Sequence, residues 1–365
     1  MKATLTQNLF RRPQPTNEVE AVGHLDAGSV IEVVETVHGK PLDGNDIWHK
    51  AREGFFLWGG GVEVLNRESL LFPISFPITE PQVEISKTSW AHSKFGILDI
   101  WNQSGSKGEN VNIAVLDSGI DETSIEFDTI LAKRNFNSAF PPDSVHDLDG
   151  HGTQMTGIIA ANGRSVFGVS PKSRLLIGKM DTEDVNSIIE AVKWAVNNHA
   201  DIISMSFERR ENNQLLFDEL IKCKEKGIAI ICAAGNGGQS GEVKDRFPAS
   251  HSCCYSIGAC DQNFKKLEIS NLSNHLKLLA PGTDVLTAKS GGGATIAESG
   301  SSIATAYTSG IVALLLSIVR KNNPNANGVS IIEKLIQNTT VFPHMNDKLA
   351  YGNGVINPFK TFSQL

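Results

Sequence analysis

From about residue 90 onward, short apolar runs alternate with stretches of helical periodicity. The runs have the length of β-strands and are mainly apolar, namely 111–116, 174–178, 201–206 and 228–232. Between the last three, apolar residues recur at helical spacing, in Val185, Ile188, Ile189, Val192 and Val196 and again in Leu216, Leu220 and Cys223. Such alternation is typical of a mostly parallel sheet with helices on both faces. The sequence therefore predicts an α/β fold for the region 90–365.

The first 71 residues follow a different pattern, which is typical of a small all-β domain. Their β-type runs are 29–37, 47–51, 55–58 and 62–64, and the intervening segments 38–46 and 59–61 are rich in turn-forming residues. This spacing predicts a small β-barrel over residues 1–71. The segment 72–89 contains Pro73, Pro77 and Pro81, so it is predicted to be an extended linker.

Composition and charge argue against several classes of partner. The chain has 365 residues, of which 40% are hydrophobic and 20% are charged, as in an ordinary soluble protein. Its formal net charge of -7 argues against nucleic acid or an anionic membrane, because its overall field would attract neither. No apolar run reaches the ~18 residues of a membrane-spanning helix, and the N-terminus lacks the apolar core of a secretory signal.

The cysteines indicate a compartment. There are five of them, an odd number, and no C-x-x-C pair occurs among Cys223, Cys232, Cys253, Cys254 and Cys260. Four of the five lie in or beside apolar stretches, so we expect buried free thiols rather than disulfides. Because free thiols persist in reducing compartments, and because no secretory signal is visible, the sequence predicts a cytoplasmic protein.

The first chemical motif places Asp117 at the end of the apolar run 111–116, directly before Ser118 and Gly119. In open parallel sheets, sites form at the carboxyl ends of the strands, which makes Asp117 a candidate catalytic residue. An Asp at this position also caps turns, and the motif alone does not separate the two roles.

The second motif holds His151 between Gly150 and Gly152, at the start of the helix-like run 155–160. Glycines on both sides allow another backbone or a substrate to approach closely. A single histidine is more often structural than catalytic, but the flanking glycines favour a functional role.

The third motif places Ser302 shortly before an apolar helical run, 311–319. A serine at the start of a helix often serves only as the N-cap. As a nucleophile it would benefit from the same location, because a helix N-terminus stabilises negative charge that develops beside it. Together the motifs give the chain order Asp, His, Ser, which is the order found in subtilisin.

With these motifs the region from about residue 90 to 365 resembles the subtilase family of serine peptidases. Further stretches agree with the family pattern, namely 233–236, 247–249, 280–282 and 351–357. The resemblance implies a catalytic triad of Asp117, His151 and Ser302, with Asn236 as the side-chain donor of the oxyanion hole. It also implies that Met205, Ser206, Ala233, Ala234 and Gly235 line the cleft for a protein or peptide substrate.

The chain departs from the family pattern beside this cleft. Where the family usually has Leu-Gly-Gly after the cleft serine, this chain has Phe207, Glu208 and Arg209. These bulky and charged residues predict a narrowed or charge-selective cleft, and therefore a processing or regulatory protease rather than a digestive one. No calcium-loop motif is present, and Asp143, Asp147 and Asp149 are expected to form a solvated loop. We therefore assign no metal and no cofactor.

The N-terminal segments 46–50 and 54–62 resemble bacterial SH3-like domains, which typically bind peptides or cell-wall material. We expect Trp48 to lie in the core of this domain and Trp58, beside three glycines, to be its binding aromatic. The predicted role is a module with a peptide or protein ligand that recruits substrate or regulates the protease.

Two other functions fit the same sequence. The altered segment after Ser206 would suit a catalytically silent pseudo-protease that binds peptides without cutting them, although all three triad residues are present. The SH3-like resemblance would suit a secreted enzyme directed to the cell wall, although the cysteines and the absence of a signal segment argue against it.

Overall fold

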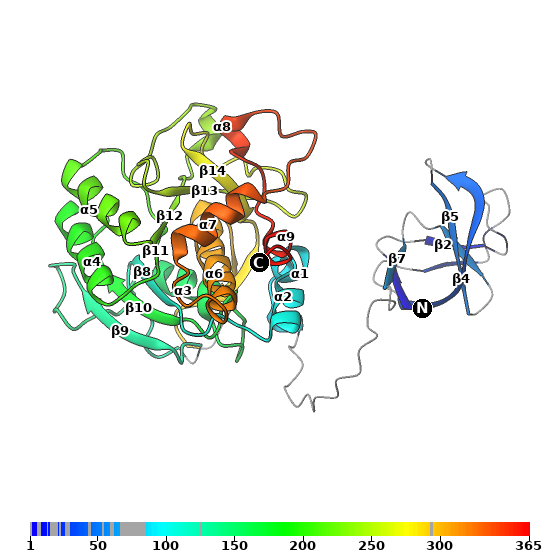
Figure 1. Ribbon diagram of the computed structural model, residues 1–365, viewed down its shortest axis with the longest axis horizontal. Helices are drawn as coiled ribbons and strands as arrows, with labels where there is room; N and C mark the ends of the chain where they lie inside the picture. Colours follow the sequence, from blue (N-terminus) through cyan, green and yellow to red (C-terminus); the bar gives the residue numbers. More distant parts are fainter. Residues whose placement is uncertain are drawn as a thin grey trace. The chain divides into compact units, whose positions relative to one another are not determined.

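The computed structural model describes residues 2–5, 9–12, 14, 21, 23–25, 30–42, 45–52, 55–58, 62–65 and 85–365, except 125 and 293–294. The chain divides into two compact units, Met1–Pro81 and Gln82–Leu365 (Figure 1).

The described part of the first unit consists of antiparallel strands. One sheet has the order β6-β5-β4-β1-β7 and contains β1 (Lys2–Leu5), β4 (Val30–Leu42), β5 (Asn45–Ala51), β6 (Phe56–Trp58) and β7 (Val62–Leu65). A separate pair joins β2 (Leu9–Arg11) and β3 (Gly23–Leu25). The turn predicted at 38–46 is wrong in extent, because β4 continues through 38–42 and β5 begins at Asn45.

Among the described residues of this unit, Ile31, Val33, Ala51 and Leu57 form a buried apolar cluster. Trp48 is only 1% exposed, as expected for a core residue, and its indole N–H donates to the carbonyl of Lys40. Trp58, expected to be exposed, is half-buried and packs against the apolar cluster. Its side chain therefore already contributes to the packing of this unit.

The second unit contains the predicted α/β fold. Its sheet has the order β14-β13-β12-β11-β8-β10-β9, and every neighbouring pair is parallel. The strands are β8 (Asn112–Asp117), β9 (Ile130–Asn135), β10 (Arg174–Lys179), β11 (Ile202–Met205), β12 (Ala229–Ala233), β13 (Tyr255–Cys260) and β14 (Leu276–Pro281). The four strands expected from apolar runs correspond to β8, β10, β11 and β12. A two-stranded antiparallel hairpin, β15 (Val285–Ala288) and β16 (Thr295–Glu298), lies outside this sheet.

Helices cover both faces of the sheet (Figure 1). Alternate residues of β8 show why, since Ile113 and Val115 enter one apolar cluster while Ala114 and Leu116 enter the other. The first cluster also contains residues of α3 (His151–Ala160), α6 (Ser301–Arg320) and α7 (Gly328–Gln337), and the second contains residues of α4 (Val185–Asn197) and α5 (Gln214–Glu225). The remaining helices are α1 (Trp90–Lys94), α2 (Ile97–Ser104), α8 (Lys348–Tyr351) and α9 (Pro358–Phe362), with short 3-10 turns η2 (Ile85–Lys87) and η3 (Gly238–Ser240).

The start of the second unit lies earlier than residue 90. The segment 85–89, placed in the linker by sequence, forms η2 and the N-cap of α1. Its Lys87 carbonyl accepts a hydrogen bond of 2.8 Å from the backbone N–H of Phe167, and the Ser89 hydroxyl accepts one from the N–H of Ala91. These bonds tie the segment to the second unit.

Helix α6 runs through the middle of the second unit. Its mean hydropathy of 1.8 and its length of 20 residues would suit a membrane span, but 83% of its most apolar window is buried inside the protein. The helix is therefore a core helix of the second unit, which accounts for its apolar composition. The five cysteines are also buried, and all are free thiols, as predicted. Burial raises the pKa of Cys223 to about 12, which keeps this thiol protonated and unreactive.

Candidate active site

Asp117 is the last residue of β8, a strand with β10 on one side and β11 on the other. Chain connections diverge to the two sides of β8, and open α/β sheets form their binding crevices at such a point, beyond the carboxyl ends of the strands. The Asp117 side chain is buried and accepts a hydrogen bond of 2.7 Å from the N–H of Ser118. Asp117 therefore caps its own turn. Because a carboxylate oxygen can accept more than one hydrogen bond, Asp117 can still contact a second group.

His151 is the first residue of α3, and a close contact of two backbones brings it to Asp117. A Cβ atom added to Gly152 would lie 2.3 Å from the carbonyl oxygen of Gly119, so this helix start approaches the Asp117 turn closely only because it has no side chain. Gly119 itself has φ +124° and would place a Cβ 2.3 Å from the carbonyl of Val145. Gly152 and Gly119 therefore serve contact between protein backbones.

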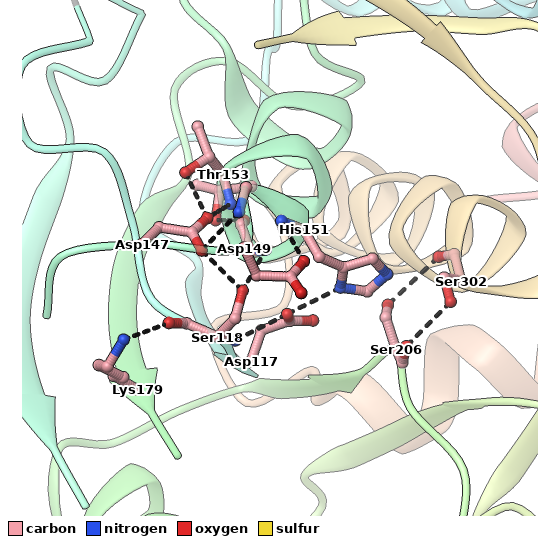
Figure 2. A network of polar contacts seen from close by, with 12 residues as sticks. Asp117, Ser118, Asp147, Asp149, His151, Thr153, Lys179, Ser206 and Ser302 are labelled. Carbon is pink, nitrogen blue, oxygen red and sulfur yellow. Dashed lines mark hydrogen bonds and ion pairs between the residues drawn. The ribbon is translucent and has the colours of Figure 1, made fainter. Parts of the chain in front are cut away.

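The His151 ring is bound to Asp117. Its Nδ1 lies 2.8 Å from Oδ1 of Asp117, and Figure 2 shows the other ring nitrogen on the side of Ser302. Burial by itself would lower the pKa of His151. The charge and hydrogen bond of Asp117, with the more distant charges of Asp149 and Asp147, outweigh burial and raise that pKa to about 9.

Ser302 lies in the first turn of α6, directly beside the residue that follows β11. The N-cap of the helix is Gly300, which excludes the simple capping role for Ser302. The Ser302 hydroxyl donates a 2.9 Å hydrogen bond to the carbonyl of Ser206, and the Ser206 hydroxyl donates one of 3.2 Å to the carbonyl of Ser302. Among the described residues, no hydrogen bond joins Ser302 Oγ to His151, although the two side chains face each other in Figure 2.

Asn236 follows β12 and is oriented by the start of α6. Its Oδ1 accepts a 2.9 Å hydrogen bond from the backbone N–H of Ser301. Because a backbone N–H can only donate, this bond fixes which end of the amide is oxygen, and it leaves the Asn236 NH₂ group available as a donor. Backbone N–H groups in the first turn of α6, such as that of Ser302, have no partner within the helix. The site therefore presents two kinds of donor beside one hydroxyl.

The residues predicted to line the cleft have two different environments. The side chains of Met205, Ala233 and Ala234 are at most 2% exposed and belong to the core, so any contact with substrate there would involve the main chain. Ser206 and Gly235 lie directly beside α6, because Ser206 bonds to Ser302 and the N–H of Gly235 donates to the hydroxyl of Ser301.

Asp147 is a supporting residue that sequence reasoning missed. It was expected in a solvated loop, but its side chain is buried, while Asp143 and Asp149 are exposed. It accepts hydrogen bonds from the N–H of Gly150 and from the N–H and hydroxyl of Thr153, at 2.6–2.9 Å (Figure 2). Burial would raise the pKa of Asp147, but these bonds lower it overall. The charged carboxylate therefore fixes the turn that carries the histidine.

A second supporting group joins the two turns. The Ser118 hydroxyl donates to Asp147 and accepts from the N–H of Gly152, which links the Asp117 turn to α3. Lys179, at the end of β10, is buried and donates to the carbonyls of Ser118 and His146 at 2.8 and 2.7 Å. In the sequence, the one indication of this supporting role is that Lys179 ends an apolar strand.

No group of three or more His, Cys, Asp or Glu side chains that could hold a metal ion occurs among the residues that the structure describes.

Comparison with known proteins shows the family to which the chain belongs. The model of the subtilase family matches residues 108–354. The chain is 33% identical over 270 residues to an intracellular serine protease of Paenibacillus polymyxa, covering 70% of this chain and 81% of that protein. It is 30% identical over 262 residues to subtilisin amylosacchariticus of Bacillus subtilis subsp. amylosacchariticus, covering 69% of this chain and 66% of that protein.

Solved structures show the same fold. The prenylagaramide maturation protease PagA is 27% identical, has a TM-score of 0.63, and covers 73% of this chain and 97% of its own. The protease domain of PatA, solved as a serine-to-alanine mutant, is 26% identical with a TM-score of 0.62, and covers 71% of this chain and 96% of its own. This chain therefore belongs to the subtilase family of serine peptidases.

Proposed function

We propose that this protein is a serine endopeptidase that cleaves peptide bonds through Asp117, His151 and Ser302. The observation that carries the proposal is the His151 ring, which is held 2.8 Å from the Asp117 carboxylate with its other nitrogen on the side of Ser302. A serine hydroxyl is a weak nucleophile, and a histidine oriented in this way can activate it.

In the proposed reaction, His151 accepts the hydroxyl proton of Ser302 while the serine oxygen attacks the substrate carbonyl. His151 then transfers this proton to the leaving amine, and a water molecule hydrolyses the acyl-enzyme by the same steps in reverse. Because the Ser302 hydroxyl donates to Ser206 in the structure, a rotation about its Cα–Cβ bond would first redirect the proton to His151.

The carbonyl oxygen of the substrate becomes negative during the attack. The Asn236 amide and the backbone N–H of Ser302 are the proposed donors to it, and the helix N-terminus adds a favourable field. Asn236 is suited to this role because the N–H of Ser301 holds its oxygen, which leaves its NH₂ group, beside Gly300 at the start of α6, available as a donor.

A fluorophosphonate probe tests the chemistry directly. We expect the wild-type chain to be labelled at Ser302, with labelling lost in Ser302→Ala and greatly slowed in His151→Ala. Ser299→Ala, which changes an exposed serine three residues earlier, should be labelled normally. If the folded wild type is not labelled at any pH, the pseudo-protease function replaces this proposal.

We further propose that the enzyme acts on few substrates. Support comes from Phe207, Glu208 and Arg209 beside the cleft, and from the resemblance to PagA, which is named a maturation protease. Proteomic identification of new N-termini should find a small set made by the wild type and not by Ser302→Ala. Broad cleavage of denatured casein would contradict narrow specificity.

The first unit is proposed to be an SH3-like module that recruits the substrate, and the protein is proposed to be cytoplasmic. The antiparallel strands of this unit and its half-buried Trp58 support the first proposal. The five buried free thiols support the second, and the Paenibacillus relative is named an intracellular protease.

A further inference from the structure

We propose that Glu208 and Arg246 together fill the space that receives the side chain on the acyl side of the scissile bond, so that the enzyme cleaves after small residues. This inference rests on the proposed function, because it concerns the substrate that Ser302 would attack. It names two residues, 38 positions apart in the chain, as determinants of specificity.

The relevant space is defined by the contacts of α6. Ser302 bonds to the carbonyl of Ser206 on one side, and Asn236 bonds to the N–H of Ser301 on the other. A substrate carbonyl attacked by Ser302, with its oxygen directed at Asn236, therefore has its own side chain between the segments 206–209 and 233–236. Glu208 and Gly235 belong to these two segments.

The carboxylate of Glu208 already lies in that space. A Cβ atom added to Gly235 would be 1.8 Å from Oε2 of Glu208, so the carboxylate rests directly against the glycine. Arg246 Nε lies 3.3 Å from the same oxygen, and Nδ2 of Asn271 donates to it at 3.2 Å. The carboxylate is thus held by a cation and an amide in contact with the opposite wall of the cleft.

The backbone holds the two charged residues together. Arg209 and Phe247, their neighbours in sequence, exchange N–H to carbonyl hydrogen bonds of 2.7 and 2.9 Å. Arg246 is half-buried, with 19% of its side chain exposed, while Glu208 is 37% exposed. Because the backbone positions both segments, the ion pair can be replaced without separating them.

Volume rather than charge is expected to select the substrate. The adjoining cavity of about 480 Å³ is lined by three acids and three bases, namely Glu183, Glu208, Glu211, Arg209, Arg210 and Arg246. Their charges balance, so neither a cationic nor an anionic side chain gains net attraction, and no apolar lining rewards a large one. A Gly, Ala or Ser before the scissile bond is small enough to bind without entering this space.

The test compares short peptides that differ only in the residue before the scissile bond, with Gly, Ala, Phe, Lys or Asp at that position. For the wild type we expect kcat/KM to be at least about tenfold higher for the Gly and Ala peptides than for the other peptides. This factor is about the discrimination that a pocket achieves for a single extra methylene group. Glu208→Ala combined with Arg246→Ala should raise kcat/KM for the Phe peptide by about tenfold or more.

Glu208→Gln separates volume from charge, because it keeps the side-chain size and removes the carboxylate. We expect it to retain the preference for Gly and Ala. If the wild type instead cleaves best after Lys and Glu208→Gln abolishes this preference, the carboxylate selects cations and the inference is wrong. An unchanged profile in the double variant would also overturn it.

Two controls distinguish failure of this inference from failure of the proposed function. Glu219→Ala with Lys222→Ala removes an ion pair on the surface of α5 and should leave the preference unchanged. Titration with a small fluorophosphonate counts reactive Ser302 in each variant, so only folded active enzyme enters the comparison. Absence of labelling would refute the proposed function, whereas normal labelling with a preference for Phe would refute only this inference.

Discussion

At the scale of single residues, the chemistry of the site depends on neighbours that are distant in sequence. The base strength of His151 is set mainly by burial and by Asp117, which is 34 positions earlier. The turn that carries His151 is in turn fixed by a buried carboxylate, Asp147. Both effects predict measurable consequences of single substitutions.

The pH dependence of cleavage should report the raised pKa of His151. The proposed general base must be deprotonated, so kcat/KM should rise by about tenfold per pH unit and level off only near the pKa of about 9. Asp117→Asn should lower that pKa and reduce kcat by about 10⁴-fold, the general effect of removing this carboxylate from a triad. A wild-type plateau beginning near neutral pH would contradict the raised pKa.

Asp147→Asn should destabilise the fold by about 2–4 kcal/mol at neutral pH, because the amide has one accepting oxygen and cannot satisfy the donors of both Gly150 and Thr153. The pKa of Asp147 is lowered in the folded state, so its contribution is present above the ordinary value of 3.8 and is lost as pH falls through the lower folded value. Urea unfolding of the wild type and variant should therefore differ at pH 7 and converge in strong acid. Asp143→Asn, at an exposed position nearby, should have little effect; equal losses from both variants would contradict the assigned role.

At the scale of elements, close packing between a helix and its neighbours decides where the catalytic side chains lie. Helix α3 reaches the Asp117 turn through Gly152, and α6 packs through Gly310 against Val169. These glycines lie inside helices, where they are unfavourable by themselves, so their value lies in the approach that they permit.

Gly310→Ala tests whether helix propensity or close packing has the larger effect at this position. The substitution improves helix propensity by about 1 kcal/mol, but the new Cβ would lie 2.7 Å from Cβ of Val169, and overpacking costs about 1–3 kcal/mol. We expect a net loss of about 1 kcal/mol in the free energy of unfolding. Adding Val169→Ala makes room, so the double variant should lose less than the sum of the two single losses; a stabilised Gly310→Ala would show that packing does not dominate.

At the scale of the whole molecule, the first unit is proposed to contribute recruitment and the second catalysis. Trp58→Ala in the full chain should then raise KM for a protein substrate at least about fivefold, the loss of about 1 kcal/mol expected for an interface aromatic. The kcat/KM for a short peptide should not change. Ile47→Ala removes another apolar side chain that is 38% exposed in the same unit and provides the control. Equal losses with both substrates would indicate a general effect on folding.

Much of this organisation could be predicted from sequence, because it depends on local periodicity. Apolar runs predicted β8, β10, β11 and β12, and helical spacing predicted α4 and α5. The carboxyl end of β8 and the glycines around His151 identified two of the candidate catalytic residues, since strand ends and glycine turns have local signatures.

The remainder was decided by tertiary structure. No periodicity connects Ser302 to Ser206 or Glu208 to Arg246, and none marks Asp147 as buried. Such contacts depend on differences of an ångström between atoms from separate elements, and on whether water reaches them. The sequence by itself determined which elements form and which residues stand at their ends. Only packing of those elements determined which side chains touch, because hydrogen bonds and excluded volume act over a few ångströms in space.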